Sequence, residues 1–314
     1  MTKAFEVLVP VLVTMGLAYG AAWHGRFGAD QVPILNKMVL LYAVPMSISV
    51  GILRLSRHAL VDHAALMLVL VLGLALIDAI AFGLIRWVFR RDLGTSALQA
   101  MAISFPAVPF IGPSLLIPLF GTDGAILIAA VALGGNILIV PFTMMCLSMA
   151  EAENSQYATD TSLGTHLRAA LAHGVSQPIV WAPVLSLIIV LAGVQMGSTF
   201  DDSLALLGAA GGGVGLFTTG IVLRSQSAAL TRPVIASVVG KNVVTPLAML
   251  GAAYLVGQGA HGGEIAVTTS ILAAPIITTL AIENRVAIKE MSSTLLLSAL
   301  ASIVTTGAFI VFAT

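Results

Sequence analysis

The sequence predicts an all-α membrane protein of ten transmembrane helices, arranged as two five-helix repeats that are inverted relative to each other. Three observations support this: an apolar composition, ten apolar stretches of spanning length, and helix breakers at matching places in the two halves. The chain is 58% hydrophobic and only 9% charged, with a mean hydropathy of +1.04. Because soluble domains carry about 25% charged residues, this composition excludes an ordinary soluble domain.

Each predicted span follows from its length, because a helix needs about 20 mostly apolar residues to cross the hydrocarbon core. Ten such segments lie near residues 4–23, 34–53, 64–88, 97–120, 123–149, 175–196, 203–223, 231–257, 264–282 and 292–313. The first is interrupted by Glu6 and Pro10 and runs on to Trp23, so we expect a retained span and not a cleaved signal peptide.

The longest polar interruption, EAENSQYATDTSLGTH at 151–166, predicts a cytoplasmic linker. It separates a first repeat at 1–150 from a second at 167–314. An odd number of spans per repeat reverses the direction of the chain, so related halves would be inverted in the membrane.

The basic residues divide unequally between the two sides of the predicted membrane. With loops assigned alternately, the side that holds the N-terminus collects Lys3, Arg54 and Arg57. The other side collects Arg26, Lys37, Arg86, Arg90, Arg91, Arg168, Arg224, Arg232, Arg285 and Lys289. Because cytoplasmic loops are enriched in lysine and arginine, the second side is predicted to be cytoplasmic and both termini periplasmic or extracellular.

Helix breakers fall at matching places in the two halves. In the second and seventh spans they are Pro45 and the run Gly211–Gly213; in the ninth span it is Pro275. The fourth span contains a cluster: Pro106, Pro109, Pro113 and Pro118. Paired interruptions of this kind are the best sequence indication of a transporter's substrate site. The glycine run has a second interpretation, a surface for close helix packing, and that alternative stays open.

Broken fourth and ninth helices would leave unpaired backbone groups near the middle of the membrane. Such backbone is tolerated only where it is buried in protein or lines a wet cavity. The N-terminal end of a half-helix carries about half a positive charge, so two such ends suit a small anion.

Three polar side chains lie deep inside predicted spans. Asp78 and Lys241 are ionisable, and Asn136 is an amide. Charges at that depth cost at least about 2.5–3.5 kcal/mol, which makes them candidates for function. Lys241 would attract an anion and Asp78 would carry a proton; alternatively, the two pair with each other structurally. Asn136 would contact substrate or satisfy broken backbone.

The sequence lacks the residues that other functional classes require. The single cysteine, Cys146, excludes an intramolecular disulfide, and the six histidines show no metal-binding spacing, so we interpret them as solvated and expect no metal site and no cofactor. Walker and GxSxG motifs are absent, so we do not expect an enzyme. The formal net charge of zero gives no reason to expect a nucleic-acid partner.

Four segments resemble motifs of the auxin efflux carrier family. LNKMVLLYAVPMSISVG at 35–51 and SFPAVPFIGPSLLIPLFG at 104–121 resemble its second-helix and fourth-helix motifs, QPIVWAPVLSLIIVLAGV resembles its sixth helix, and AAPIITTLAIENRV its ninth. Bacterial members that transport malonate and other small dicarboxylates are the most similar. The family's usual fourth-helix asparagine is missing from Ala107-Val108-Pro109-Phe110, which puts an amide contact there in doubt.

This resemblance implies broken helices 4 and 9 that cross at the substrate site, as in sodium–proton antiporters and bile-acid transporters. It also implies scaffold helices 1, 2, 6 and 7, transport helices 3–5 and 8–10, a homodimer, and a bacterial inner membrane location. The candidate substrate-binding residues are Pro45, Ser47, Pro106, Val108, Pro109, Asn136, Lys241, Pro275 and Ile277, with Asp78 and Lys241 as proton-coupling or supporting residues.

The predicted function is therefore alternating-access transport of small organic anions, such as malonate-like or auxin-like carboxylates. A cation–proton or sodium-coupled transporter of the same fold is the alternative, although Asn136 stands where such antiporters need an acid. A lipid-modifying membrane enzyme is a remote alternative, because it would need clustered histidines or acids at one membrane face.

Overall fold

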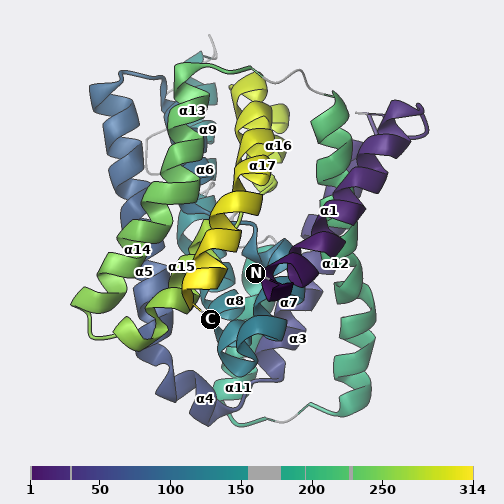
Figure 1. Ribbon diagram of the computed structural model, residues 1–314, viewed down its shortest axis with the longest axis vertical. Helices are drawn as coiled ribbons and strands as arrows, with labels where there is room; N and C mark the ends of the chain where they lie inside the picture. The colour runs from purple at the N-terminus through teal and green to yellow at the C-terminus, as the bar shows by residue number, and fades with distance from the viewer. Residues whose placement is uncertain (1, 29, 155–177, 195, 226–228, 314) are drawn as a thin grey trace.

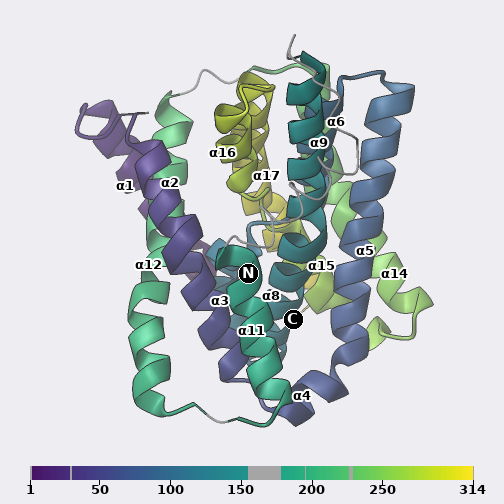
Figure 2. The ribbon, with the colours of Figure 1, turned by 180° about the vertical axis from the view of Figure 1, so that it is seen from behind.

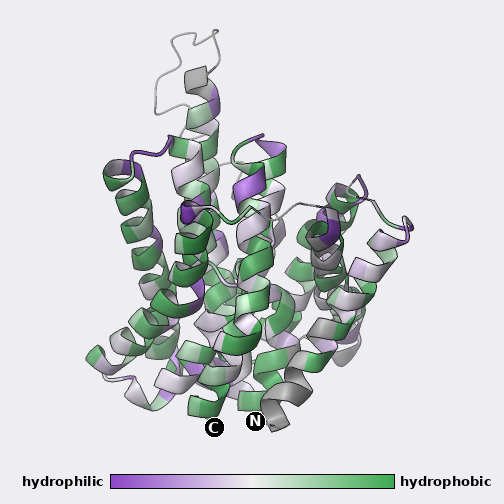
Figure 3. Ribbon diagram, turned by 45° about the horizontal axis from the view of Figure 1, so that its top comes forward, coloured by the Kyte–Doolittle hydropathy of each residue, from purple (hydrophilic) through white to green (hydrophobic). Residues whose placement is uncertain are grey.

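The computed structural model describes residues 2–28, 30–154, 178–194, 196–225 and 229–313, and every regular element in these ranges is a helix (Figure 1). The helix bodies are largely hydrophobic, whereas hydrophilic residues gather at helix ends and in the connections between helices (Figure 3). This confirms the prediction of an all-α membrane protein. Most of the predicted linker at 151–166 lies outside the described residues.

The helices follow the predicted hydrophobic segments closely. In the first half they are α1 Thr2–Trp23, α2 Val32–Met38, η1 Val39–Ala43, α3 Val44–Leu53, α4 Arg57–Asp62, α5 Ala64–Gly83, η2 Leu84–Val88, α6 Leu93–Ser104, α7 Val108–Phe120, α8 Thr122–Gly134, η3 Gly135–Ile139 and α9 Val140–Asn154. In the second half they are α11 Pro178–Leu191, α12 Ser198–Ser225, α13 Arg232–Val239, η4 Gly240–Val244, α14 Thr245–Leu255, η5 Gly259–His261, α15 Gly262–Ser270, α16 Ile276–Glu283 and α17 Ile288–Ala313.

Six continuous helices in the described residues are long and apolar enough to cross a membrane. They are Val32–Leu53, Ala64–Val88, Thr122–Glu151, Thr199–Val222, Arg232–Leu255 and Ile288–Ala313. The pairs α6–α7 and α15–α16 do not meet this criterion because each is divided into two short helices. The protein is thus a multi-pass membrane protein.

The helices form two groups that lie side by side. Helices α1, α3 and α12 pack together with α11, and the pair α1 and α12 lies at one edge in both views (Figures 1 and 2). The other group contains α5, α6, α8 and α9, together with α13 to α17. Contacts of α7 with α12, and of α3 with α8, join the two groups.

Proline residues set the positions of three π-helical turns. Pro45, Pro141 and Pro246 each stand two residues after the end of η1, η3 and η4. A proline ring clashes with the carbonyl four residues before it, and here that carbonyl lies inside the wider π turn. The helix therefore bulges and continues. The prediction that Pro45 interrupts its span was wrong to this extent: it produces a π turn and not a break.

The glycine run of the seventh span does not break its helix either. α12 is continuous from Ser198 to Ser225, so the predicted interruption at Gly211–Gly213 was wrong. A Cβ atom on Gly208 would lie 2.8 Å from the Ser47 backbone, and one on Gly212 would lie 2.8 Å from the Phe110 carbonyl oxygen. These glycines let neighbouring backbones approach closely, which is the packing alternative left open by the sequence.

Candidate functional site

The two unwound segments cross and are joined through their backbones. Pro106 and Ala273 form an antiparallel bridge. The Ala107 N–H donates to the Leu272 carbonyl at 2.8 Å, and the Ala274 N–H donates to the Phe105 carbonyl at 3.0 Å. We call residues 105–107 and 271–275 the crossover. Its buried backbone would otherwise lack partners, because both helices stop on either side of it.

The break in the fourth span is narrower than its prolines suggested. Only residues 105–107 separate α6 from α7, and Pro109 lies in the first turn of α7. A proline is tolerated there because its missing N–H would have no partner within the helix. Pro113 and Pro118 lie inside α7. Of the four prolines, Pro106 is the one at the bridge.

Four half-helix ends converge on the crossover. α6 and α15 end there, and α7 and α16 begin there. Helix ends carry partial charges, negative at the C-terminus and positive at the N-terminus. The crossover thus presents two positive and two negative ends inside the protein. Val108 and Ile277 stand in the first turns of the two positive ends and are fully buried.

Lys241 reaches the negative end of α15. Its side chain is fully buried, and its Nζ donates to the Thr269 carbonyl at 2.6 Å. A lysine ammonium has three donors, and this is one hydrogen bond. The π turn η4 carries Lys241 on the inner side of its span. When it is protonated, the lysine therefore brings a positive charge to the crossover with donor capacity remaining.

Asp78 reaches the corresponding end of α6. Residue Asp78 is 3% exposed, and Ser104 Oγ donates to its carboxylate Oδ1 at 2.8 Å. Ser104 is the last residue of α6. Asp78 and Lys241 thus contact the last turns of the two half-helices that precede the crossover. Among the ion pairs of the described residues, none joins Asp78 to Lys241, so the structural pairing considered from the sequence is wrong.

A hydroxyl and amide network holds the second crossover strand in place. The Ala273 N–H donates to Ser298 Oγ at 3.0 Å, and Ser298 Oγ in turn donates to Asn242 Oδ1 at 2.8 Å. Asn242 Nδ2 returns a bond to the Ser298 carbonyl at 3.1 Å. Nearby, Thr306 Oγ1 donates to the Ser270 carbonyl at 3.0 Å. η4 and α17 together fix the strand, and the sequence did not single out Ser298 or Thr306.

Asn136 lies close to the first crossover strand but does not hold it. Its Nδ2 donates to the Ala132 carbonyl of its own helix at 2.8 Å, and its buried Oδ1 has no hydrogen-bond partner in the described structure. A Cβ atom on the adjacent Gly135 would come within 2.1 Å of the Phe105 ring. Glycine is therefore required there, and Asn136 is free to offer an acceptor. Of its two predicted roles, satisfying broken backbone finds no support.

The predicted site residues fall into two sets. Pro106, Val108, Pro109, Pro275 and Ile277 belong to the crossover or to the first turns after it. Pro45 and Ser47 lie on α3, where the described contact of Ser47 is with Gly208 of α12. The structure therefore gathers the first set with Lys241 and Asp78, whereas Ser47 lies in the packing between α3 and α12 and Pro45 follows the π turn η1.

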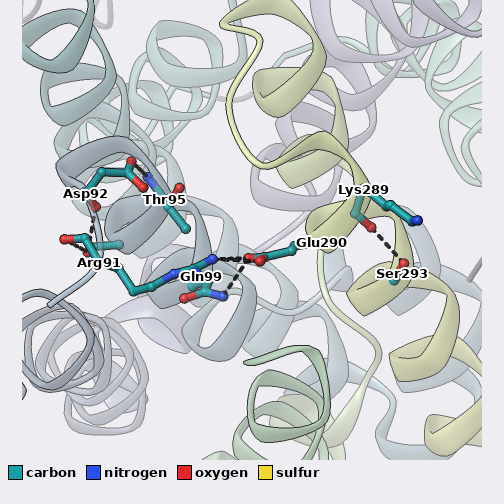
Figure 4. Close-up of polar contacts among 8 residues, drawn as sticks. Arg91, Asp92, Thr95, Gln99, Lys289, Glu290 and Ser293 are labelled. Carbon is teal, nitrogen blue, oxygen red and sulfur yellow. Dashed lines mark hydrogen bonds and ion pairs between the residues drawn. The ribbon is translucent and has the colours of Figure 1, made fainter. Parts of the chain in front are cut away.

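A second polar cluster lies at the far end of α6 (Figure 4). Arg91 donates to Glu290 of α17 at 2.6 Å, and Gln99 donates to the same carboxylate at 3.1 Å. Asp92 caps α6 by accepting from the Thr95 N–H at 2.8 Å. This cluster joins the start of α6 to the start of α17. Sequence analysis counted Arg91 only as a loop cation.

Hydrogen bonding lowers the pKa of Asp92. Partial burial opposes ionisation of this carboxyl, but the backbone and side chain of Thr95, its own backbone N–H and the Arg91 charge outweigh that effect and bring the pKa below 3.8. The carboxylate also faces the positive end of α6, which favours its charged form.

A cavity of about 820 Å³ lies between α5, α6 and the η4–α14 segment. Its lining is mostly apolar, from Ile77 on α5 to Ile103 on α6 and Ala236 on α13, with Arg91, Gln99 and Arg232 among the lining residues. Neither Lys241 nor the crossover prolines line it. The apolar part of this lining accommodates hydrocarbon better than a small carboxylate. The crossover, where four helix ends and Lys241 converge, remains the candidate site.

The family described as membrane transport proteins matches residues 3–310, almost the whole chain. The chain belongs to this family. The resemblance to auxin efflux carriers inferred from its motifs is thereby confirmed. The uncharacterized transporter YfdV of Escherichia coli K12 is 28% identical over 257 residues, which cover 81% of this chain and 78% of YfdV. Its counterparts in Escherichia coli O157:H7 and Shigella flexneri match equally well.

Proposed function

We propose that this membrane transporter carries small organic anions, such as malonate-like or auxin-like carboxylates, by alternating access at the crossover. Lys241 is the observation that carries the proposal. A fully buried lysine with one hydrogen bond to a carbonyl and no carboxylate partner in the described structure keeps its positive charge only when a negative charge lies nearby. An anion bound between Lys241 and the half-helix N-termini would supply that charge.

The arrangement of the two halves supports an inverted repeat of ten spans, 1–150 and 167–314. Asp78 contacts Ser104 at the end of α6, and Lys241 contacts Thr269 at the end of α15. Counted along the chain, the two contacts sit in equivalent spans of the proposed repeats. We further propose the scaffold and transport division, a homodimer, and the bacterial inner membrane with both termini outside.

The direct test is transport by purified protein in liposomes. A panel of labelled carboxylates that includes malonate is expected to show protein-dependent uptake or exchange. If no carboxylate gives a flux above empty liposomes with or without a pH gradient, the proposal of anion transport fails.

Lys241→Ala tests the binding role of the lysine. The variant is expected to lose most anion binding, at least about tenfold in affinity, because a buried charge pair of more than about 1.4 kcal/mol is removed. Lys289→Ala is the matched control, since Lys289 is an exposed cation on α17. Wild-type affinity in the Lys241 variant would assign the lysine to structure alone.

Asp78→Asn tests proton coupling. Asparagine retains an oxygen for the Ser104 hydroxyl, so the fold should persist. If Asp78 carries the coupled proton, a pH gradient will no longer drive uptake in this variant, although exchange of labelled for unlabelled anion will continue. Uptake that still follows the pH gradient would exclude Asp78 as the proton carrier.

A further inference from the structure

Two histidines and two carboxylates gather at the end of the molecule opposite to the Arg91–Glu290 cluster. His63 stands just before α5, Asp123 in the first turn of α8, His261 at the end of η5, and Glu264 in the first turn of α15. Figure 1 shows α4, which leads into α5, and the α14–α15 connection at the lower end of the molecule. His63 and His261 are two of the six histidines expected from the sequence to be solvated. Here each is partly buried and lies beside a carboxylate.

The side chains of this group are close and partly buried. His63 Nε2 lies 3.1 Å from Asp123 Oδ1, and His261 Nδ1 lies 3.0 Å from Glu264 Oε2. One ligand atom each from Asp123, His261 and Glu264 lie within 4.8 Å of one another. Their side chains are 32%, 28% and 21% exposed. The start of α8 and the η5–α15 junction thus direct ligand atoms to one point.

We propose that Asp123, His261 and Glu264 form a binding site for a divalent transition metal ion, with Zn²⁺ as the best fit. Imidazole and carboxylate ligands together suit zinc, which binds them at about 2.0–2.2 Å. Neighbouring ligands in a tetrahedral zinc site are then about 3.4 Å apart, so atoms already within 4.8 Å reach it through small side-chain rotations.

Electrostatics favours one shared cation over two independent ion pairs. Two carboxylates from different helices approach each other here and repel when both are ionised, unless a positive charge lies between them. A metal ion satisfies both at once. His63 is placed as a positioning residue, because its contact with Asp123 Oδ1 fixes the carboxylate while the other oxygen stays available. Three protein ligands leave a fourth position for water.

Such a site would fix the ends of several helices of one group relative to each other. The ion would connect the starts of α8 and α15, and His63 would tie the start of α5 to them through Asp123; all three helices belong to the proposed transport helices. It would therefore hold these helices together without linking them to α1, α3, α11 or α12. Bound metal is expected to raise thermal stability without blocking transport.

Zinc binding by detergent-purified protein tests the site. The full chain, freed of its affinity tag and treated with a chelator, is titrated with ZnCl₂ by calorimetry, and its melting temperature is recorded with and without zinc. The wild type is expected to bind zinc stoichiometrically and to melt higher with it. His261→Ala and the nearly isosteric Glu264→Gln are expected to lose both signals, and His63→Ala to weaken binding by about 10–100-fold.

His24→Ala, just after the end of α1, is the matched control, since His24 is exposed and has no part in the cluster. It is expected to bind zinc as the wild type does. Wild-type zinc binding in Glu264→Gln, or no binding by the wild type, would overturn the proposal. An equal response to MgCl₂ would also overturn it, because magnesium takes oxygen ligands and has no use for His261.

Discussion

At the scale of single residues, the free-energy cost of burying a charge in the membrane identified the candidate functional side chains. Asp78 and Lys241 stood out in the sequence because a charge inside a span is expensive, and both reach the helix ends beside the crossover. Their partners were not predictable. Ser104 is a common small residue, and Thr269 contributes only a backbone carbonyl, which every residue has.

The metal-binding cluster escaped sequence analysis for a related reason. His63, Asp123 and His261 come from three distant stretches and look like ordinary loop residues one by one. Only the spacing of His261 and Glu264, three apart at a helix start, gave a local signal. Tertiary structure supplies the rest.

Asp92 gives a pH-dependent prediction at this scale. Its pKa in the folded protein lies below the ordinary 3.8, so its stabilising effect is present above pH 4 and is lost as the pH falls through the folded pKa. Asp92→Asn should therefore melt below the wild type at neutral pH, and the difference should shrink as the pH is lowered toward 3. Scanning fluorimetry in detergent measures it. A difference that stays constant with pH would contradict this account.

At the scale of elements, prolines and glycines predicted a broken helix correctly in the fourth and ninth spans, where the helix backbone loses its hydrogen-bond partners. They predicted one wrongly in the second and seventh spans, where the helix continues. The breaks were predicted because Pro106 and Pro275 interrupt corresponding spans of the two halves, and the family resemblance implied that they cross. The glycine run was misread because glycine both weakens a helix and allows close packing. Buried contact with α3 and α7 decides between these roles, and sequence alone does not show which neighbours α12 has.

Pro246 tests the link between a proline and a functional side chain. Replacing it by alanine restores an N–H and removes the clash that supports η4, so the turn should relax to a regular α-helix. Lys241, which lies in that turn five residues before the proline, would rotate away from Thr269. We expect anion affinity to fall about tenfold or more while circular dichroism stays helical.

Pro233→Ala is the control for that experiment, because Pro233 lies in the first turn of α13, where the missing N–H matters little. It should keep wild-type affinity. If Pro246→Ala also keeps it, the π turn is not what positions Lys241.

At the scale of the whole molecule, α12 of one helix group contacts α7, which joins the two groups, and backbones approach closely at this contact. Gly212 of α12 lies against the Phe110 carbonyl of α7, and Gly208 lies against α3. Helix α7 carries one of the half-helix ends of the crossover, so this contact connects the candidate site to the opposite group.

Gly212→Ala should destabilise the protein. The added Cβ would lie 2.8 Å from a backbone oxygen, which cannot move away as a side chain would. Overpacking of this kind costs about 1–3 kcal/mol. The neighbouring Gly213→Ala is the matched control, since its Cβ would meet nothing within 4 Å. Melting temperatures compare the two, and an equal change in both would rule out the packing role.

The crossover bridge has a consequence for how such a transporter diversifies. Both of its hydrogen bonds are made by backbone atoms of Phe105, Ala107, Leu272 and Ala274, so they survive a change of side chain at any of these positions to another residue that keeps its N–H. Mutation can then change the side chains of the proposed site while the two backbone hydrogen bonds of the crossover are kept. Related proteins can in this way acquire new substrates by point substitution while they inherit the same framework.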